Sequence, residues 1–155
     1  MSTLAYVGSA IAGTVAISLA TAYALGAFDY KYENFLKYAT GNGFVYIGDK
    51  EDSDSNSVKS LIGTGNDLSD YSKRLKRNWN NLLRDFEKPS ELEENLFSGS
   101  SSVLVSKLDN IVEFVKAWCQ AFANKPTQNK KNWTEKEIKA DKDWAAFEAV
   151  CLIKK

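Results

Sequence analysis

The stretch Val103–Ala123, VLVSKLDNIVEFVKAWCQAFA, decides the fold class that we expect for this chain. Apolar residues recur in it at spacings of three and four, which is the period of an amphipathic α-helix. One stripe contains Leu104, Leu108, Ile111, Val115, Trp118 and Phe122, with Val112 and Cys119 beside it. A helix of this length must bury such a stripe against other elements, so the sequence predicts a helical core.

The segment before this helix carries the same period. Its apolar positions are Leu68, Tyr71, Leu75, Trp79, Leu82, Leu83 and Phe86. Asp67 or Ser69 is suited to cap the start of the helix, and Pro89 marks its end. Ser90 and Glu93 then have the spacing of a capping box for a short helix that ends near Phe97.

The C-terminal segment predicts one further helix. Thr134 and Glu137 have the spacing of a capping box, and Trp133 and Ile138 can form a hydrophobic staple around it. The apolar side of this helix would contain Ile138, Trp144, Ala145, Phe147, Cys151 and Leu152, and Lys154 and Lys155 would favour its C-terminal end.

Weaker signals precede these helices. Residues 30–39 predict a short helix that Gly41–Gly43 stops, and Phe44–Ile47 is a short run of residues suited to a strand. The sequence therefore predicts a mainly α protein in which residues 29–155 form a small soluble helical bundle. The bundle has about four main helices and room for one short β element.

The N-terminal residues have a different character. Leu4–Phe28 is 25 residues long and contains no charge, which is enough to cross a bilayer as a helix. Ala22–Ala24 fits a signal-peptide cleavage site, but no Lys or Arg precedes the apolar run, which is also longer than usual for a signal peptide. We therefore predict that residues 1–28 form a transmembrane anchor or an uncleaved signal segment and that residues 4–28 contact the membrane. Lys31 and Lys37 follow the span and slightly favour a cytoplasmic C-terminal domain.

Composition excludes several classes of function. Lys and Arg together number 20, and so do Asp and Glu, so the neutral chain has no overall field to attract nucleic acid. There is no histidine, which excludes His-dependent catalytic triads and removes the commonest zinc ligand. The chain also lacks a P-loop, a dinucleotide-binding fingerprint and a nucleophile elbow. We therefore predict no enzyme activity, no catalytic residue, no cofactor, no metal ligand and no nucleic-acid partner.

Two charged stretches imitate binding sites. Asp52, Asp54 and Asn56 match the first ligands of an EF-hand loop, but Ser57 and Gly63 replace its glycine and its bidentate glutamate. A solvated acidic loop is therefore the better interpretation.

Basic residues near Trp79 invite a nucleic-acid interpretation; they are Lys73, Arg74, Lys76, Arg77 and Arg84. Trp79 lies on the apolar stripe, however, so we predict a core tryptophan and a solvated basic face.

The two cysteines, Cys119 and Cys151, leave two interpretations open. They form no CxxC pair, and we favour two buried free thiols, because free cysteine behaves as a small apolar residue. The alternative is a disulfide bond, which requires an oxidising compartment.

Several of these features together form a pattern. An uncharged anchor leads into a DSDS-like acidic patch, then to Trp79-Asn80-Asn81-Leu82, to Trp118-Cys119, and to a second cysteine near the C-terminus. This pattern resembles the paralogous families of short uncharacterised proteins of hemotropic mycoplasmas. The resemblance implies a surface protein involved in antigenic variation and host contact, with its domain outside the cell. It carries over no functional residue.

We therefore expect a single-pass, membrane-anchored, non-enzymatic surface protein in the cell membrane, whose soluble domain is extracellular. A protein partner fits this expectation, but no residue identifies one. The alternative is a cytoplasm-facing membrane adaptor or assembly subunit, which the lysines after the span favour.

Overall fold

The computed structural model describes residues 31–65, 67–86, 92, 96–97, 105–126 and 132–155. The described residues from Tyr32 onward form one compact unit. The predicted membrane segment, residues 4–28, lies outside the described residues. Within the described ranges, no helix has both the length and the apolar character needed to cross a bilayer.

The described part of the chain is mainly helical, as predicted. Its helices are α2 (Phe35–Gly41), α3 (Val58–Ile62), α4 (Asp70–Asp85), α6 (Leu108–Ala123), α7 (Glu135–Ala140) and α8 (Trp144–Cys151). Its strands are β1 (Lys31–Tyr32), β2 (Phe44–Tyr46), β3 (Trp133–Thr134) and β4 (Leu152–Lys154). The strands form two separate pairs, β1 with β3 and β2 with β4.

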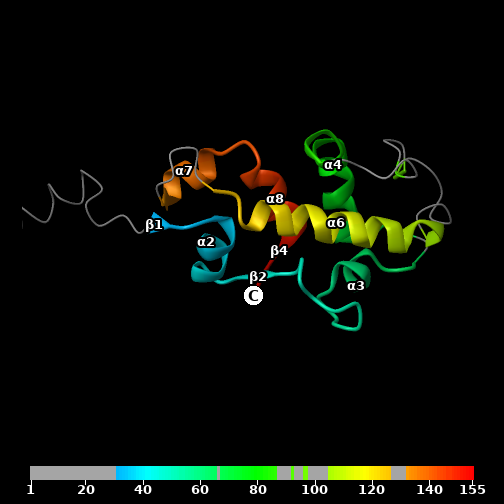
Figure 1. Cartoon of the computed structure of the whole chain (residues 1–155). Coiled ribbons are helices and arrows are strands. Elements are labelled where there is room, and N and C mark those ends of the chain that lie inside the picture. The colour runs from blue at the N-terminus through cyan, green and yellow to red at the C-terminus, as the bar shows by residue number, and fades with distance from the viewer. Residues whose placement is uncertain (1–30, 66, 87–91, 93–95, 98–104, 127–131) are drawn as a thin grey trace, which may run out of the picture. The chain divides into compact units, whose positions relative to one another are not determined.

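Helix α6 provides the longest apolar stripe of the core, and it contacts α8, α3 and α2 (Figure 1). Its predicted stripe is confirmed at Ile111, Val115 and Trp118, which are all completely buried. The described helix starts at Leu108, whereas the predicted start, Val103, lies outside the described residues.

Helix α4 matches its predicted pattern closely. Tyr71, Leu75, Trp79 and Leu82 are buried, and α4 contacts α8 along this face. The hydroxyl of Ser69 accepts a hydrogen bond from the backbone N–H of Ser72 at 3.0 Å, which confirms Ser69 as the cap.

The prediction of a single C-terminal helix is wrong. The capping box of Thr134 and Glu137 is present, but α7 ends at Ala140 and α8 begins only at Trp144. The carboxylate of Asp141 accepts a hydrogen bond from the backbone N–H of Asp143 at 2.9 Å. Such a local side-chain bond competes with the helical one, so the helix breaks here.

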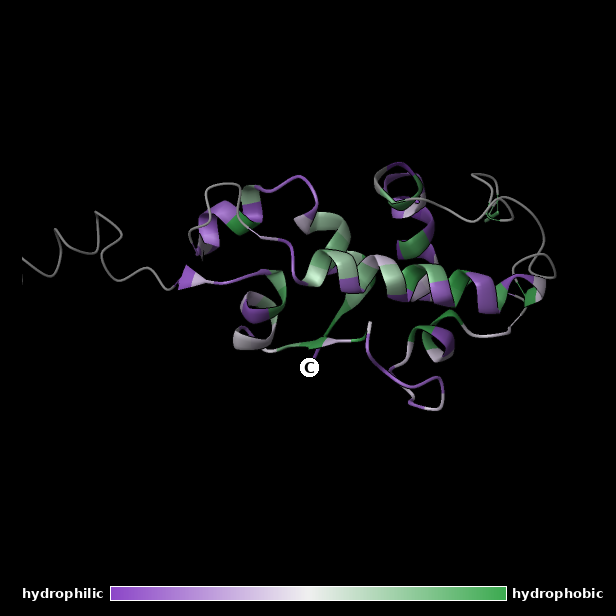
Figure 2. Ribbon diagram, in the orientation of Figure 1, coloured by the Kyte–Doolittle hydropathy of each residue, from purple (hydrophilic) through white to green (hydrophobic). Residues whose placement is uncertain are grey.

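The end of the chain is also a strand rather than a helix end. Strand β4 pairs antiparallel with β2, so Phe44 lies opposite Lys154 and Tyr46 lies opposite Leu152. The predicted β element therefore forms, and its partner is the last segment of the compact unit. Figure 2 shows hydrophobic residues concentrated along α8 and β4, which explains why this segment stays in the core.

Two groups of aromatic rings fill the core. Around α2 and α8, the ring of Phe35 lies 5.3 Å from Trp144 and 5.5 Å from Phe147. Between α4 and α6, Trp79 lies 5.5 Å from Phe114. All four tryptophans are buried, so they hold the elements together rather than offering a surface for ligands.

Candidate functional site

The acidic loop has no calcium-like arrangement. Asp52 forms ion pairs with Lys116 at 3.6 Å and with Lys59 at 3.8 Å, and Asp54 pairs with Lys50 at 3.6 Å. Lysine ammonium groups therefore pair with the carboxylates that would bind calcium in an EF-hand loop. The described residues contain no group of three or more acidic or cysteine side chains placed to hold a metal ion.

A second charged cluster is partly buried at the loop after α6. The Lys125 ammonium is 2.8 Å from a carboxylate oxygen of Asp141, 2.7 Å from one of Asp143, and 5.6 Å from the centre of the Phe35 ring. Burial by itself lowers the pKa of Lys125, but the hydrogen bonds to the two carboxylates outweigh burial and raise it. The cluster fastens the loop after α6 to the break between α7 and α8, which is a structural role.

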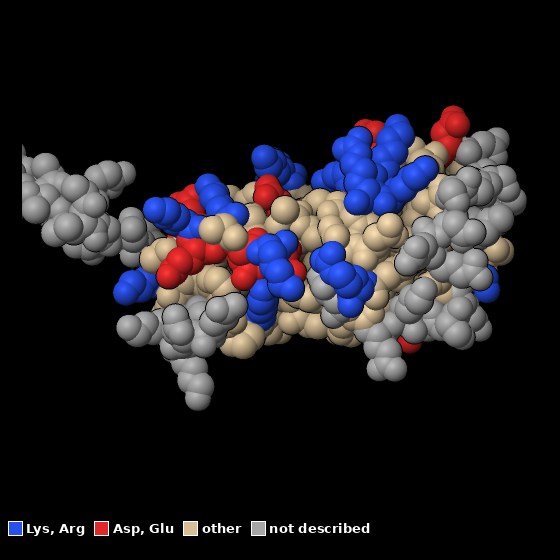
Figure 3. Space-filling model, turned by 90° about the horizontal axis from the view of Figure 1, so that it is seen from above, with Lys and Arg blue, Asp and Glu red and all other residues tan. Residues whose placement is uncertain are grey.

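The predicted basic face lies on α4. We use "basic face" for its exposed cations, which are Lys73, Lys76, Arg77 and Arg84. Figure 3 views the molecule from above, the side where α4 lies in Figure 1, and shows lysines and arginines gathered there. Trp79 is only 1% exposed, which confirms the prediction that it belongs to the core.

Beside the basic face lies a hollow of about 520 Å³ between α4, α8 and the β2–β4 pair. Its apolar lining consists of Phe44, Ala145, Ala149, Leu152 and Ile153, and its charged lining consists of Arg74, Glu148 and Lys154. We call this the α4–β4 hollow.

Both cations of the α4–β4 hollow rest on aromatic rings. The Arg74 guanidinium lies 5.6 Å from the centre of the Tyr71 ring, and the Lys154 ammonium lies 5.9 Å from the centre of the Phe44 ring. Cation–π contacts of this kind restrict where the charges sit. The hollow thus combines two positioned cations, one carboxylate and an apolar floor.

Sequence reasoning did not identify this hollow. It placed Arg74 on a solvated face, Lys154 at a helix end and Phe44 in an isolated strand. These residues come from elements far apart in the chain, and no short motif joins them. A second hollow, of about 420 Å³, lies over α6, but the charged residues that line it include Asp52 and Lys116, which already pair with each other.

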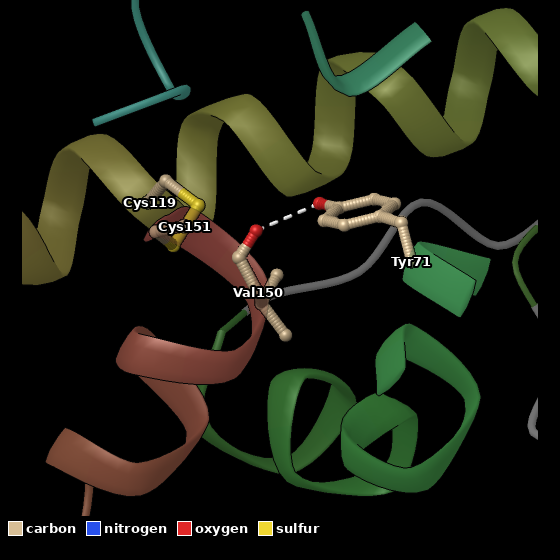
Figure 4. The surroundings of a disulfide bond; sticks show 4 residues. All are labelled: Tyr71, Cys119, Val150 and Cys151. Carbon is tan, nitrogen blue, oxygen red and sulfur yellow. Dashed lines mark hydrogen bonds between the residues drawn. A yellow bond between two sulfur atoms is a disulfide. The ribbon is translucent and has the colours of Figure 1, made fainter. Parts of the chain in front are cut away.

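The largest departure from the sequence prediction concerns the cysteines. Cys119 and Cys151 form a disulfide bond between α6 and the end of α8, with a Cα–Cα distance of 5.6 Å (Figure 4). The prediction of two free thiols is wrong, because the packing of α8 on α6 brings together residues that are 32 apart in the chain. Both cysteines are completely buried.

The surroundings of the disulfide are tightly packed. The hydroxyl of Tyr71 on α4 donates a hydrogen bond to the carbonyl oxygen of Val150 at 2.7 Å, next to Cys151 (Figure 4). A Cβ atom added to Gly48 would lie 2.8 Å from the Cβ of Cys119 and closer still to the Tyr46 side chain, so only glycine fits. A bond enclosed in this way serves stability rather than thiol exchange, which needs an accessible sulfur.

Comparisons with known proteins give no relative. No family model matches the chain, and neither a curated protein nor a solved structure matches it. The resemblance to the mycoplasma families therefore stays a prediction.

Proposed function

We propose that the chain is a membrane-anchored, non-enzymatic surface protein whose helical domain is displayed outside the cell. The observation that carries this proposal is the disulfide bond between Cys119 and Cys151. Disulfide bonds persist in oxidising compartments and are rare in the cytosol, where thiols are kept reduced. A stable structural disulfide in the domain therefore favours an exterior location.

The disulfide outweighs the charge bias around the predicted anchor. That bias rests on Lys31 and Lys37, which alternate with Asp29 and Glu33 within a few residues of the span. Two lysines specify orientation weakly, whereas disulfides are rare in the cytosol, so the disulfide supports an exterior location more strongly.

We also propose that the chain is not an enzyme. The chain contains no histidine, and the partly buried cluster of Lys125, Asp141 and Asp143 is internally paired. Contact with host molecules, or antigenic display, is the role that the resemblance implies. The cytoplasm-facing adaptor remains the alternative, and the disulfide disfavours it.

Two measurements test the location, the first on intact cells and the second on cells dissolved directly in the trapping solution. First, a protease added outside should remove an epitope tag placed after Lys155, while a cytosolic marker protein survives. Second, free thiols are trapped in denaturant with a polyethylene-glycol maleimide, which adds mass at each cysteine. Without reductant we expect no adduct, and with reductant we expect two.

The variant Cys151→Ser serves as the control for trapping, because its single remaining cysteine should react without reductant. A tag that is degraded only after lysis, together with two adducts on the unreduced parent chain, would overturn the proposal and favour the cytoplasmic adaptor.

A further inference from the structure

The charges of this neutral chain are unevenly distributed. Helix α4 carries five lysines and arginines but only two aspartates, Asp70 and Asp85, which lie at its ends. Lys73 of the basic face pairs with Asp70 at 3.4 Å. Positive charge also comes from Lys76 and Arg77 in the middle of the helix and from Arg74 and Lys154 in the neighbouring hollow. Charges spread in this way over two elements fit an extended anion better than a single small one.

The α4–β4 hollow continues the basic face. Arg74 lines the hollow and is three residues from Arg77, and residues at this spacing are neighbours on a helix surface. Lys154 adds a second cation on another element that lines the hollow. A ligand that follows the basic face can therefore reach a site with two cations beside aromatic rings, the carboxylate of Glu148 and an apolar floor.

This combination discriminates among polyanions. A nucleic acid gains affinity from exposed aromatic residues that stack on bases, whereas the described tryptophans are all buried and the one aromatic ring that lines the hollow, Phe44, is partly buried beside Lys154. A membrane surface gains affinity from apolar side chains that insert into it, and the one large hydrophobic residue found exposed in the described part, Val105, is outside the hollow. A sugar ring has apolar C–H groups for the floor, hydroxyl donors for Glu148 and, when sulfated, an anion for each cation.

We propose that the α4–β4 hollow and the basic face together bind a sulfated polysaccharide. This inference rests on the proposed function, because such polymers meet a protein outside cells. One sulfated sugar unit occupies the hollow, with its anionic groups on Arg74 and Lys154. The neighbouring units follow the basic face of α4.

The test uses heparin as the probe and the purified full chain in an uncharged detergent. We expect binding at 50 mM salt that weakens by about tenfold or more at 200 mM salt, because these charge contacts are exposed to screening. The double variant Arg74→Glu/Lys154→Glu should lose at least about tenfold in affinity. The double variant Lys76→Glu/Arg77→Glu should lose a similar factor.

The matched control is Lys37→Glu/Lys136→Glu, which changes the net charge equally on two exposed lysines of α2 and α7. It should change the affinity by less than about twofold, and all variants should retain the thermal unfolding midpoint of the parent chain. An equal loss in this control would show that only total charge matters and would overturn the proposal.

Three further ligands complete the test. Uncharged dextran should not bind, and single-stranded DNA and vesicles of anionic phospholipid should bind more weakly than heparin. Failure to bind heparin at 50 mM salt, or equal or tighter binding to DNA or vesicles, would overturn the proposal. These results are independent of the protease and trapping measurements on cells, so the display proposal and the polysaccharide proposal can fail separately.

Discussion

Tyr71 and Tyr46 are both buried, but their hydroxyl groups have different surroundings. The hydroxyl of Tyr71 donates to the carbonyl oxygen of Val150, whereas the hydroxyl of Tyr46 has no hydrogen-bond partner in the described part of the chain. Burial, and to a smaller extent the charge of Asp49, raises the pKa of Tyr46 to about 12. Burial also raises the pKa of Tyr71. Comparing the two residues therefore separates the effect on stability of a hydrogen-bonded buried hydroxyl from that of an unpaired buried hydroxyl.

Removing each hydroxyl should have unequal effects at neutral pH. We expect Tyr71→Phe to lower the free energy of unfolding by about 1–2 kcal/mol, because the Val150 carbonyl loses its partner. Tyr46→Phe should cost less than about 0.5 kcal/mol or stabilise the protein, since it removes an unpaired buried polar group. Urea unfolding at pH 7 measures both values, and equal losses would contradict this interpretation.

Alkaline pH should destabilise the fold through the same two residues. The unfolded tyrosines ionise near pH 10, while the folded ones keep their protons, so the folded state binds more protons. The stability that these groups provide is complete below pH 10 and is lost as the pH rises toward 12. Urea unfolding at pH 9, 10 and 11 should show that the free energy of unfolding falls less steeply with pH for Tyr46→Phe than for the parent chain. Parallel falls in the two proteins would argue against a role of the Tyr46 hydroxyl in alkaline destabilisation.

At the scale of elements, the start of α7 depends on residues close together in the chain. The backbone N–H of Thr134 donates to the Glu137 carboxylate at 2.8 Å, and the Thr134 hydroxyl accepts from the Glu137 N–H at 3.3 Å. The same residue belongs to β3, which pairs with β1. The capping box thus marks the point where the chain passes from strand to helix.

The contribution of the capping box to the free energy of unfolding should be measurable. We expect Thr134→Ala to lower the free energy of unfolding by about 1 kcal/mol, because an N–H at the helix start loses its acceptor. Thr134→Ser keeps a hydroxyl and should stay within about 0.5 kcal/mol of the parent chain. Thermal or urea unfolding compares the two variants, and a serine variant as unstable as the alanine one would assign the effect to packing instead.

At the scale of the whole molecule, the disulfide restricts the unfolded chain more than any other single contact described. It closes a segment that includes α7 and α8, with a sequence separation of 32 between the two cysteines. Closing a loop of this length stabilises a fold by about 3–4 kcal/mol in the chain-entropy treatment. The domain should therefore be considerably less stable in a reducing compartment.

The double variant Cys119→Ala/Cys151→Ala should lower the free energy of unfolding by about 3–4 kcal/mol. Reductant should destabilise the parent chain by a similar amount and leave the double variant unchanged. Urea unfolding with and without reductant checks this, and a parent chain that ignores reductant under unfolding conditions would exclude the disulfide.

The sequence by itself determined the features that depend on neighbouring residues. The apolar period predicts α4 and α6, and the spacing of Thr134 and Glu137 predicts the start of α7, because helical hydrogen bonds and caps join residues three and four apart. The same period placed Trp79 in the core. The break at Asp141 was missed because Lys125, its partner from outside the helix, helps to hold the carboxylate that opens the helix.

Only the tertiary structure decided the features that join distant segments. Strand β2 pairs with β4, Cys119 meets Cys151, and Arg74 faces the same hollow as Lys154, although none of these pairs has a local signature. Such contacts form because the apolar faces of α4, α6 and α8 pack together, and that packing then sets which surface residues become neighbours. The candidate site and the compartment that the disulfide favours both follow from this packing.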